Sequence, residues 1–386
     1  MIAAAIIAKD EARSIERCLR SIAPYVDEIV LVDTGSTDGT AAIAAACGAR
    51  VEHFAWCDDF AAARNFTLDR VRSPWRLILD ADEWLVHGGE ALRALGSAGG
   101  TPPFVGLTEV RNEFDDSGSV SMLRSWIPRV LPSSVRYQGR IHEQPVHPLP
   151  ITRLDVAIGH DGYRKAQQEK KGDRNERLLR AELSRSPDDP YLHYQMGKEQ
   201  EGRENYSAAC ACYQQARELL GWPPADAALT AAMQHRNPWL HAMTIRHLYS
   251  LRQAGRVRDA LRYAEADEPC WRHSPDFHFA LGDLLLDFAI EAPGRAAELL
   301  PRIETHWKRC LEIGETPMLD GSVAGRGSHL AAHNLAVFFH ALGDAQSATR
   351  YQHLATSAFP MQRSRSARKI SPACPQHPGS GFRLPE

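Results

Sequence analysis

Long hydrophobic runs are missing from this sequence of 386 residues. No stretch approaches the roughly 20 apolar residues that a transmembrane helix needs. The apolar start, Met1–Ala8, is too short for a membrane span or a signal peptide and has no basic region before it, so we interpret it as a first strand. These absences predict a cytoplasmic protein without a transmembrane segment.

Strong charge of either sign is also missing, because the net charge is −3 and acidic and basic residues are interspersed. Nothing therefore indicates a nucleic-acid partner or a polybasic membrane surface. The eight cysteines are scattered and form no Cys-X-X-Cys pair, which suits a reducing cytosol. Cys210 and Cys212 lie in a helical pattern, where core packing is favoured over metal binding.

The first 80 residues alternate between short apolar runs and helical patterns. Strands are expected at Ile2–Ala8, Glu28–Asp33, Val51–Phe54 and Arg76–Leu79, and helices at Ser14–Ile22, Thr40–Cys47 and Phe60–Val71. This alternation predicts a mostly parallel sheet with right-handed crossovers. From about 96 to 150, extended segments on either side of Asp115–Gly118 predict a hairpin within an antiparallel or mixed extension of that sheet.

Most of the second half of the sequence is helical. Gly197, Ala209, Tyr213 and Ala216 have the spacing of a tetratricopeptide unit, and two weaker copies follow. A plain helical bundle explains the same pattern, and that alternative stays open. Either arrangement gives a surface suited to protein contact or to formation of a homodimer.

We therefore expect three regions along the chain. Residues 1–165 form an α/β domain, and residues 166–360 form an all-α helical-repeat domain. Residues 361–386 are rich in Arg, Ser, Pro and Gly and poor in apolar residues, which predicts a disordered tail.

Three carboxylates, Asp80, Asp82 and Glu83, follow the fourth expected strand. Side chains alternate along extended backbone, so Asp80 and Asp82 point the same way, at the edge where open α/β sheets bind ligands. Two close negative charges repel each other, and a divalent cation is the simplest way to stabilise both. The alternative is an acidic loop that caps a helix beginning near Trp84.

The segment Asp33-Thr-Gly-Ser-Thr-Asp-Gly39 joins a strand to a helix. Asp33 can accept hydrogen bonds from a nucleobase or a ribose, Gly35 permits a tight turn, and Ser36 or Asp38 can cap the helix. The sequence has neither the Gly-X-Gly-X-X-Gly fingerprint nor a Walker loop. A well-capped turn without a ligand is the alternative.

The segment Trp56-Cys-Asp-Asp-Phe-Ala-Ala-Ala-Arg-Asn65 enters the helix that precedes the acidic strand. Asp58 or Asp59 is expected to cap this helix. Arg64 lies about one and a half turns further on, where its guanidinium could fork onto a phosphate or carboxylate. The alternative is an exposed helical arginine.

Two later motifs contain histidine. In Gly139-Arg-Ile-His-Glu143, Glu143 beside His142 is a plausible general base, and an ion pair between Arg140 and Glu143 is the alternative. His160 follows an apolar stretch and is a candidate third ligand for a transition metal. For a single histidine, the alternative is a satisfied core residue.

In this order and spacing, the motifs resemble those of inverting family 2 glycosyltransferases of the GT-A fold. The sequence is most similar to the bacterial subgroup with a tetratricopeptide-like helical C-terminus, which includes the bacteriocin S-glycosyltransferases. The resemblance is dense over residues 1–165 and looser over 170–360. Asp-Thr-Gly-Ser-Thr-Asp, Ala-Arg-Asn and Asp-Ala-Asp-Glu are all present, whereas the family's Asn-Glu appears here as Asp10-Glu11.

The resemblance implies a GT-A domain with a Rossmann-like mixed sheet, followed by the TPR-like helical domain. It also implies a UDP-sugar donor. Asp33 and Arg64 would hold the uracil, ribose or phosphates, and the backbone from Ala8 to Glu11 would line the base.

For the reaction centre, the resemblance implies a Mn²⁺ or Mg²⁺ ion. Asp82 would ligate this ion, Asp80 would meet the ribose or the metal shell, and His160 matches the family's C-terminal metal histidine. Glu143, with His142 as second choice, would take the proton of the acceptor. The acceptor itself stays open between a peptide or protein side chain and a glycan.

An alternative from a different class is a non-catalytic helical-repeat scaffold. Its N-terminal domain would bind a nucleotide sugar without turnover. Release of UDP from a nucleotide sugar distinguishes the two.

Overall fold

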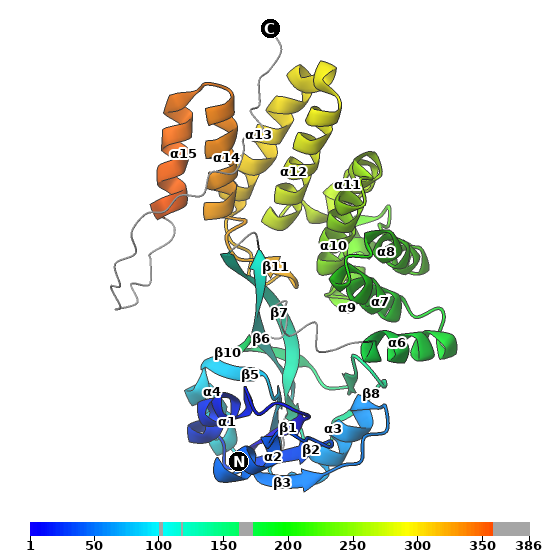
Figure 1. The fold of residues 1–386 in the computed structure, drawn as a ribbon, viewed down its shortest axis with the longest axis vertical. Coiled ribbons are helices and arrows are strands. Elements are labelled where there is room, and N and C mark those ends of the chain that lie inside the picture. Colours follow the sequence, from blue (N-terminus) through cyan, green and yellow to red (C-terminus); the bar gives the residue numbers. More distant parts are fainter. Residues whose placement is uncertain (100–102, 117–118, 162–172, 358–386) are drawn as a thin grey trace.

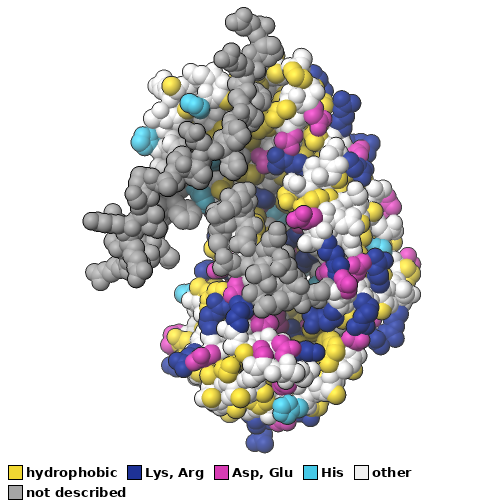
Figure 2. Space-filling view, in the orientation of Figure 1, with side chains coloured by type: hydrophobic (Ala, Val, Ile, Leu, Met, Phe, Trp, Pro, Cys, Tyr) yellow, Lys and Arg dark blue, Asp and Glu magenta, His cyan; other side chains and the backbone are white. Residues whose placement is uncertain are grey.

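The computed structural model describes residues 1–99, 103–116, 119–161 and 173–357. A mixed α/β domain forms the N-terminal part, and an arc of helices lies beyond a long β-hairpin that rises from the sheet (Figure 1). Acidic and basic side chains are interspersed over the visible face (Figure 2). Among the described residues, no helix is both long and apolar enough to cross a bilayer.

Four parallel strands form the first half of the sheet. They are β1 (Ile2–Ala8), β2 (Glu28–Asp33), β3 (Arg50–His53) and β4 (Trp75–Asp80). The helices α1 (Ile15–Ile22), α2 (Thr40–Ala46) and α3 (Phe60–Leu68) connect them. All seven elements occur where the hydrophobic periodicity predicts them, with ends that shift by up to three residues.

The central strand β1 is buried on both faces. Ile2, Ala4 and Ile6 belong to the core that contains α1, whereas Ala3 and Ala5 belong to the core that contains α3. Alternate side chains thus enter different cores, as the period of two in a strand requires. This explains why β1 is an apolar run without polar interruptions.

The second half of the sheet is mixed and contains β5 (Glu83–His87), β6 (Val105–Asp116), β7 (Ser119–Pro132) and β10 (Ile151–His160). The strand order is β3-β2-β1-β4-β7-β6-β10-β5. The predicted hairpin is present as β6–β7, although 117 and 118 in its turn lie outside the described residues. No helix begins near Trp84, because that residue lies in β5. A short pair, β8 (Arg136–Gln138) with β9 (Gln144–Val146), and helix α4 (Gly89–Ser97) complete the domain.

The helical part consists of stacked antiparallel neighbours. Its helices are α6 (Arg174–Arg185), α7 (Pro190–Gly202), α8 (Tyr206–Leu220), α9 (Ala227–Arg236), α10 (Leu240–Gln253), α11 (Val257–Trp271), α12 (Pro275–Glu291), α13 (Ala296–Ile313), α14 (His329–Ala341) and α15 (Ala345–Ser357). Successive pairs pack on one another to form the arc (Figure 1). The expected fold class, a Rossmann-like mixed sheet followed by an all-α helical repeat, is therefore confirmed.

The small residues of the repeat have a steric reason. A β-carbon added at Gly197 would lie 2.3 Å from the ring of Tyr213, so only glycine lets α7 and α8 pack this closely. Gly282 and Trp307 repeat the same contact between α12 and α13, at 2.5 Å. The repeat predicted from the sequence includes Gly197 and Tyr213 but not Gly282 and Trp307.

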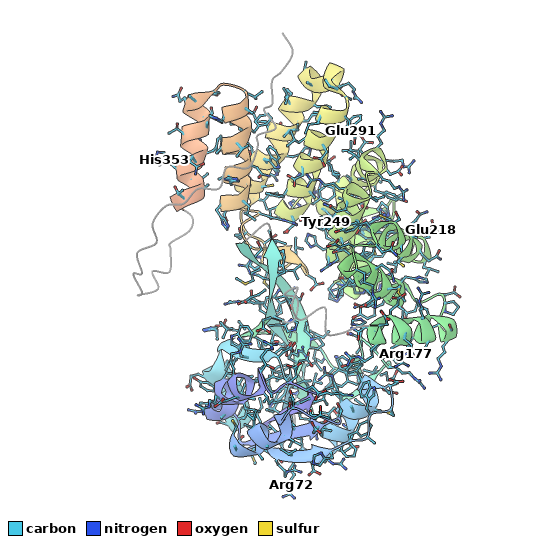
Figure 3. The ribbon with its side chains drawn as sticks, in the orientation of Figure 1. Arg72, Arg177, Glu218, Tyr249, Glu291 and His353 are labelled. Atoms are coloured by element: carbon cyan, nitrogen blue, oxygen red, sulfur yellow. The ribbon has the colours of Figure 1, made fainter. Side chains whose placement is uncertain are left out.

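Among the described residues, the helical part contacts the sheet domain both near α6 and at the hairpin. Near α6, Arg177 forms a two-bonded ion pair with Asp58, with both distances 2.8 Å; Figure 3 labels this arginine. At the hairpin, the loop between α13 and α14 (residues 314–328) contributes β11 (Ser322–Val323), which pairs with β7. The boundary at 165/166 stays a prediction, because 162–172 lie outside the described residues, as does the tail 361–386.

Candidate functional site

The carboxyl edge of the parallel strands gathers several of the predicted side chains. Ala8 pairs with Asp33 across β1 and β2, and Ile7 pairs with Asp80 across β1 and β4. Neighbouring strands lie roughly 5 Å apart, so Ala8, Asp33 and Asp80 lie side by side at one edge. This is the position at which open α/β sheets bind ligands.

The carboxylate of Asp33 stabilises the turn that follows β2. Its carboxylate accepts hydrogen bonds from the backbone N–H groups of Gly35 and Ser36, at 3.1 Å each to Oδ2. Burial acts to raise the pKa of Asp33, but the hydrogen bonds from Ser36 and Gly35 outweigh it and lower that pKa. Asp33 is thus held ionised at the strand end, with Gly35 at a φ of +105° providing the turn.

The turn after Asp33 is tied to the segment after β1. Asp10 Oδ1 accepts from the backbone N–H of Thr37 at 2.7 Å, and the backbone N–H of Glu11 donates to Thr40 Oγ1 at 2.8 Å. Glu11 Oε2 also accepts from the Ser14 hydroxyl at 2.6 Å. Asp10 and Glu11 therefore shape one wall of the site through backbone contacts.

Arg64 is not the exposed helical arginine of the alternative interpretation. It is 8% exposed, on a helix that Asp59 caps by accepting from the backbone N–H of Ala62 at 2.8 Å. Its Nη2 donates to Asp80 Oδ1 at 2.6 Å, and its Nε donates to Glu143. The neighbouring carboxylates of Asp80 and Glu143 overcome burial and raise the pKa of Arg64 well above its ordinary value.

A second buried arginine, Arg129 on β7, completes this network. Its Nη2 donates to Asp80 Oδ2 at 2.9 Å and also to Glu83. Burial acts to raise the pKa of Asp80, but Arg129 and Arg64 outweigh it and hold that pKa well below the usual range. Burial instead raises the pKa of Glu83 to about 7. Asp80 is therefore a fixed anion between two cations.

Asp82 and His160 form a separate pair next to this network. Asp82 Oδ2 lies 3.3 Å from His160 Nε2, and His160 pairs with Glu83 across β10 and β5. The two oxygens of Asp80 accept from Arg64 and Arg129 instead. Within the described residues, no cluster of three or more His, Cys, Asp or Glu side chains is arranged for a metal ion.

The donor set of this pair nevertheless fits a divalent cation. Mg²⁺ is usually bound through one or two carboxylates together with substrate phosphates. Mn²⁺ also prefers oxygen ligands, whereas imidazole is a common ligand of other first-row transition metals. An oxygen and a ring nitrogen 3.3 Å apart can both reach one ion. The pair would then supply two protein ligands, and a diphosphate would supply the others.

The Gly139–Glu143 segment lies against the helical part. Glu143 pairs with Arg64, while Arg140 lies 3.7 Å from Glu182 of α6, so the alternative ion pair between Arg140 and Glu143 is wrong. His142 has a positive φ of 52° and its carbonyl accepts from Gln144. Of the two predicted base candidates, the structure brings Glu143 into direct contact with the network.

Two contributors, Arg129 and Asn112, are absent from the sequence predictions. Arg129 stands among Ile127, Val130 and Leu131, and a charged residue inside an apolar strand is the signal that could have identified it. Asn112 Oδ1 lies 2.8 Å from His160 Nδ1. No local pattern marks it, because the contact depends on the pairing of β6 with β10.

Comparison with known sequences relates part of this chain to glycosyltransferases. Residues 4–112 match the model of glycosyl transferase family 2. A TPR repeat-containing protein of Synechococcus elongatus is 35% identical over 206 residues, which is 50% of each chain. The SPbeta prophage-derived glycosyltransferase SunS of Bacillus subtilis is 27% identical over 208 residues, or 51% of this chain and 49% of that one.

The chain spans about half the length of these curated relatives. Among solved structures, MamA from Desulfovibrio magneticus RS-1 aligns with 52% of this chain and 93% of its own, at 14% identity and a TM-score of 0.37.

Proposed function

We propose that this chain, whose residues 4–112 match the model of glycosyl transferase family 2, is a metal-dependent inverting glycosyltransferase. It moves a sugar from a UDP-sugar donor to a peptide or protein side chain, or to a glycan. The observation that carries the proposal is the Asp82–His160 pair beside the Asp80 network, at the carboxyl edge of the family-matched sheet.

The nucleotide is proposed to bind at the carboxyl end of β2, where Asp33 lies. Asp33 is ionised and can accept from uracil N–H or ribose hydroxyl groups, and the backbone from Ala8 to Glu11 lines the same wall. Arg64 reaches Asp80 at the end of β4 from helix α3, and its Nη1 is buried and without a partner among the described residues. A guanidinium in this state suits a diphosphate.

Asp82 and His160 hold the cation in this proposal. A divalent ion held there would supply positive charge to stabilise the departing diphosphate. Asp80, fixed between Arg64 and Arg129, adds negative charge beside the pair and orients the ribose side of the donor.

Glu143 is proposed as the base that takes the acceptor's proton, with His142 second. The carboxylate of Glu143 accepts from Arg64. An arriving diphosphate competes for the same guanidinium, and this competition releases Glu143 toward the acceptor. The acceptor then attacks the sugar carbon opposite the diphosphate, so the configuration inverts without a protein nucleophile.

A scaffold that binds a nucleotide sugar without turnover is the second candidate. The pairing of Glu143 with Arg64 favours it, since a carboxylate in an ion pair is a poor base. Both candidates bind donor, so binding alone does not distinguish them.

A donor screen tests the proposal. The full chain is incubated with Mn²⁺ and a set of UDP- and dTDP-sugars, and mass spectrometry follows nucleotide release. Slow release of UDP from at least one sugar, by hydrolysis in the absence of acceptor, is the expected result. Binding of UDP without release from any donor would favour the scaffold.

A further inference from the structure

Asn112 lies behind the histidine of the proposed cation pair. It is 5% exposed on β6, directly opposite His160 of β10 in the strand register. Its Oδ1 lies 2.8 Å from His160 Nδ1, which is the ring nitrogen that does not face Asp82. The two nitrogens of this ring therefore have different protein partners.

The surroundings of the Asn112 amide determine which of its atoms faces the ring. Its Nδ2 lies 3.4 Å from each of three acceptors, the carbonyls of Val110 and Leu123 and the hydroxyl of Ser125. A flipped amide would place its oxygen against two carbonyl oxygens that cannot donate. The NH₂ group therefore faces the strands, and the oxygen faces His160.

This orientation fixes the tautomer of neutral His160. Because Asn112 Oδ1 can only accept, the ring proton lies on Nδ1, and Nε2 presents its lone pair toward Asp82 Oδ2 at 3.3 Å. Two acceptors that face each other at this distance repel unless a cation or a proton lies between them. A metal-bound histidine typically donates its other ring N–H to such an outer partner.

We propose that Asn112 is the positioning residue that holds His160 in the Nδ1–H tautomer, so that Nε2 and Asp82 together can bind a divalent cation. The inference rests on the proposed function, because it concerns the same cation pair. It adds a residue that touches neither donor nor cation and that acts through His160 alone.

Nuclear magnetic resonance of the metal-free wild type tests the tautomer directly. The full chain is labelled with ¹⁵N-histidine, and His160→Gln identifies the signal. At a pH at which the ring is neutral, we expect Nδ1 to carry the proton. A His160 ring protonated on Nε2 would overturn the proposal without reference to any Asn112 variant.

The consequence for cation binding is tested by titrating Mn²⁺ into the protein in the presence of UDP. Electron paramagnetic resonance measures the free Mn²⁺. Asn112→Ala is expected to weaken Mn²⁺ binding by about tenfold to 100-fold and to give a mixture of tautomers. The matched control is Thr108→Val, on the same strand, fully buried and with an Oγ1 that has no partner among the described residues. The control should bind Mn²⁺ within about twofold of wild type.

The variant Asp82→Ala distinguishes a wrong role for Asn112 from a wrong cation pair. If Asp82→Ala loses Mn²⁺ while Asn112→Ala binds as tightly as wild type, the cation site stands and the role of Asn112 is contradicted. If Asp82→Ala also binds Mn²⁺ as wild type does, the proposed cation pair itself is wrong.

Discussion

Arg64 and Arg129 donate to opposite oxygens of one carboxylate, that of Asp80, at 2.6 and 2.9 Å. Arg64 comes from α3 and Arg129 from β7, so this carboxylate joins the parallel half of the sheet to the hairpin. Both guanidiniums are more than nine-tenths buried. The charge at the strand end is thus built from residues that are far apart in the sequence.

Removal of Arg129 should be strongly destabilising. Arg129→Met removes the arginine that contacts Glu83 and leaves Asp80 with Arg64 alone, and breaking a buried pair in this way costs about 3 kcal/mol. Urea unfolding measures the loss. Arg136→Met is the control, because the Arg136–Asp69 pair is exposed at 44% and 59%, where ion pairs contribute under about 1 kcal/mol. Equal stability of the two variants would contradict the structural role of Arg129.

Glu143→Gln should separate binding from transfer. The amide still accepts a hydrogen bond from Arg64 but cannot take a proton from an acceptor, so donor affinity is retained and transfer falls by about 10²- to 10⁴-fold. Calorimetric titration with UDP and a transfer assay measure the two effects. Glu182→Gln, at the neighbouring pair with Arg140, is the control. Loss of donor binding in Glu143→Gln would assign Glu143 to the nucleotide site.

The position of the segment that carries Glu143 should depend on its packing against the helical part. Ile141 is buried in a cluster with Leu178, Leu179 and Met196, so Ile141→Ala is expected to cost about 3 kcal/mol. Displacement of Glu143 should also reduce kcat by about tenfold or more. Ile151→Ala is the control, because Ile151 is 59% exposed. Unchanged kcat in a less stable Ile141→Ala protein would show that the helical part does not support the base.

Acid should destabilise the helical part through His247. Burial lowers the pKa of His247 from 6.5 to about 3, and the ring packs against Tyr263 with centroids 4.6 Å apart. The unfolded chain therefore binds the proton first as pH falls below 6.5, so the stability present above that pH is progressively lost between 6.5 and 3. At pH 5 the loss from this group amounts to about 2 kcal/mol.

His247→Phe isolates this contribution. Phenylalanine keeps the ring contact and removes the titrating group, so the drop in unfolding free energy between pH 7.5 and 5 should shrink by about 2 kcal/mol. An identical pH dependence in wild type and His247→Phe would show that His247 is not buried in its neutral form.

The local part of this architecture could be predicted from the sequence. The four parallel strands, a helix cap at Asp58 or Asp59 and the tight turn at Gly35 all follow from periodicity and capping chemistry within a few residues. The repeat contact between Gly197 and Tyr213 follows from spacing in the same way. These features need no knowledge of distant residues.

The side-chain partners of the site could not be predicted. Arg129 reaches Asp80 only because β7 pairs antiparallel with β4, and Asn112 reaches His160 only because β6 lies parallel to β10. Strand order beyond the first four strands is not encoded in any local pattern. The pairing of Glu143 with Arg64 was missed for the same reason, since 79 positions separate them.

The most direct test of the account is UDP release by wild type and Asp82→Ala, with and without chelator, from the sugar donor that the screen identifies. Asp155→Ala is the control, because its side chain is 90% exposed. We predict Mn²⁺-dependent release by wild type and Asp155→Ala, and none by a folded Asp82→Ala protein. Full release by Asp82→Ala after removal of metal would contradict a cation held by Asp82 and, with it, the proposed mechanism.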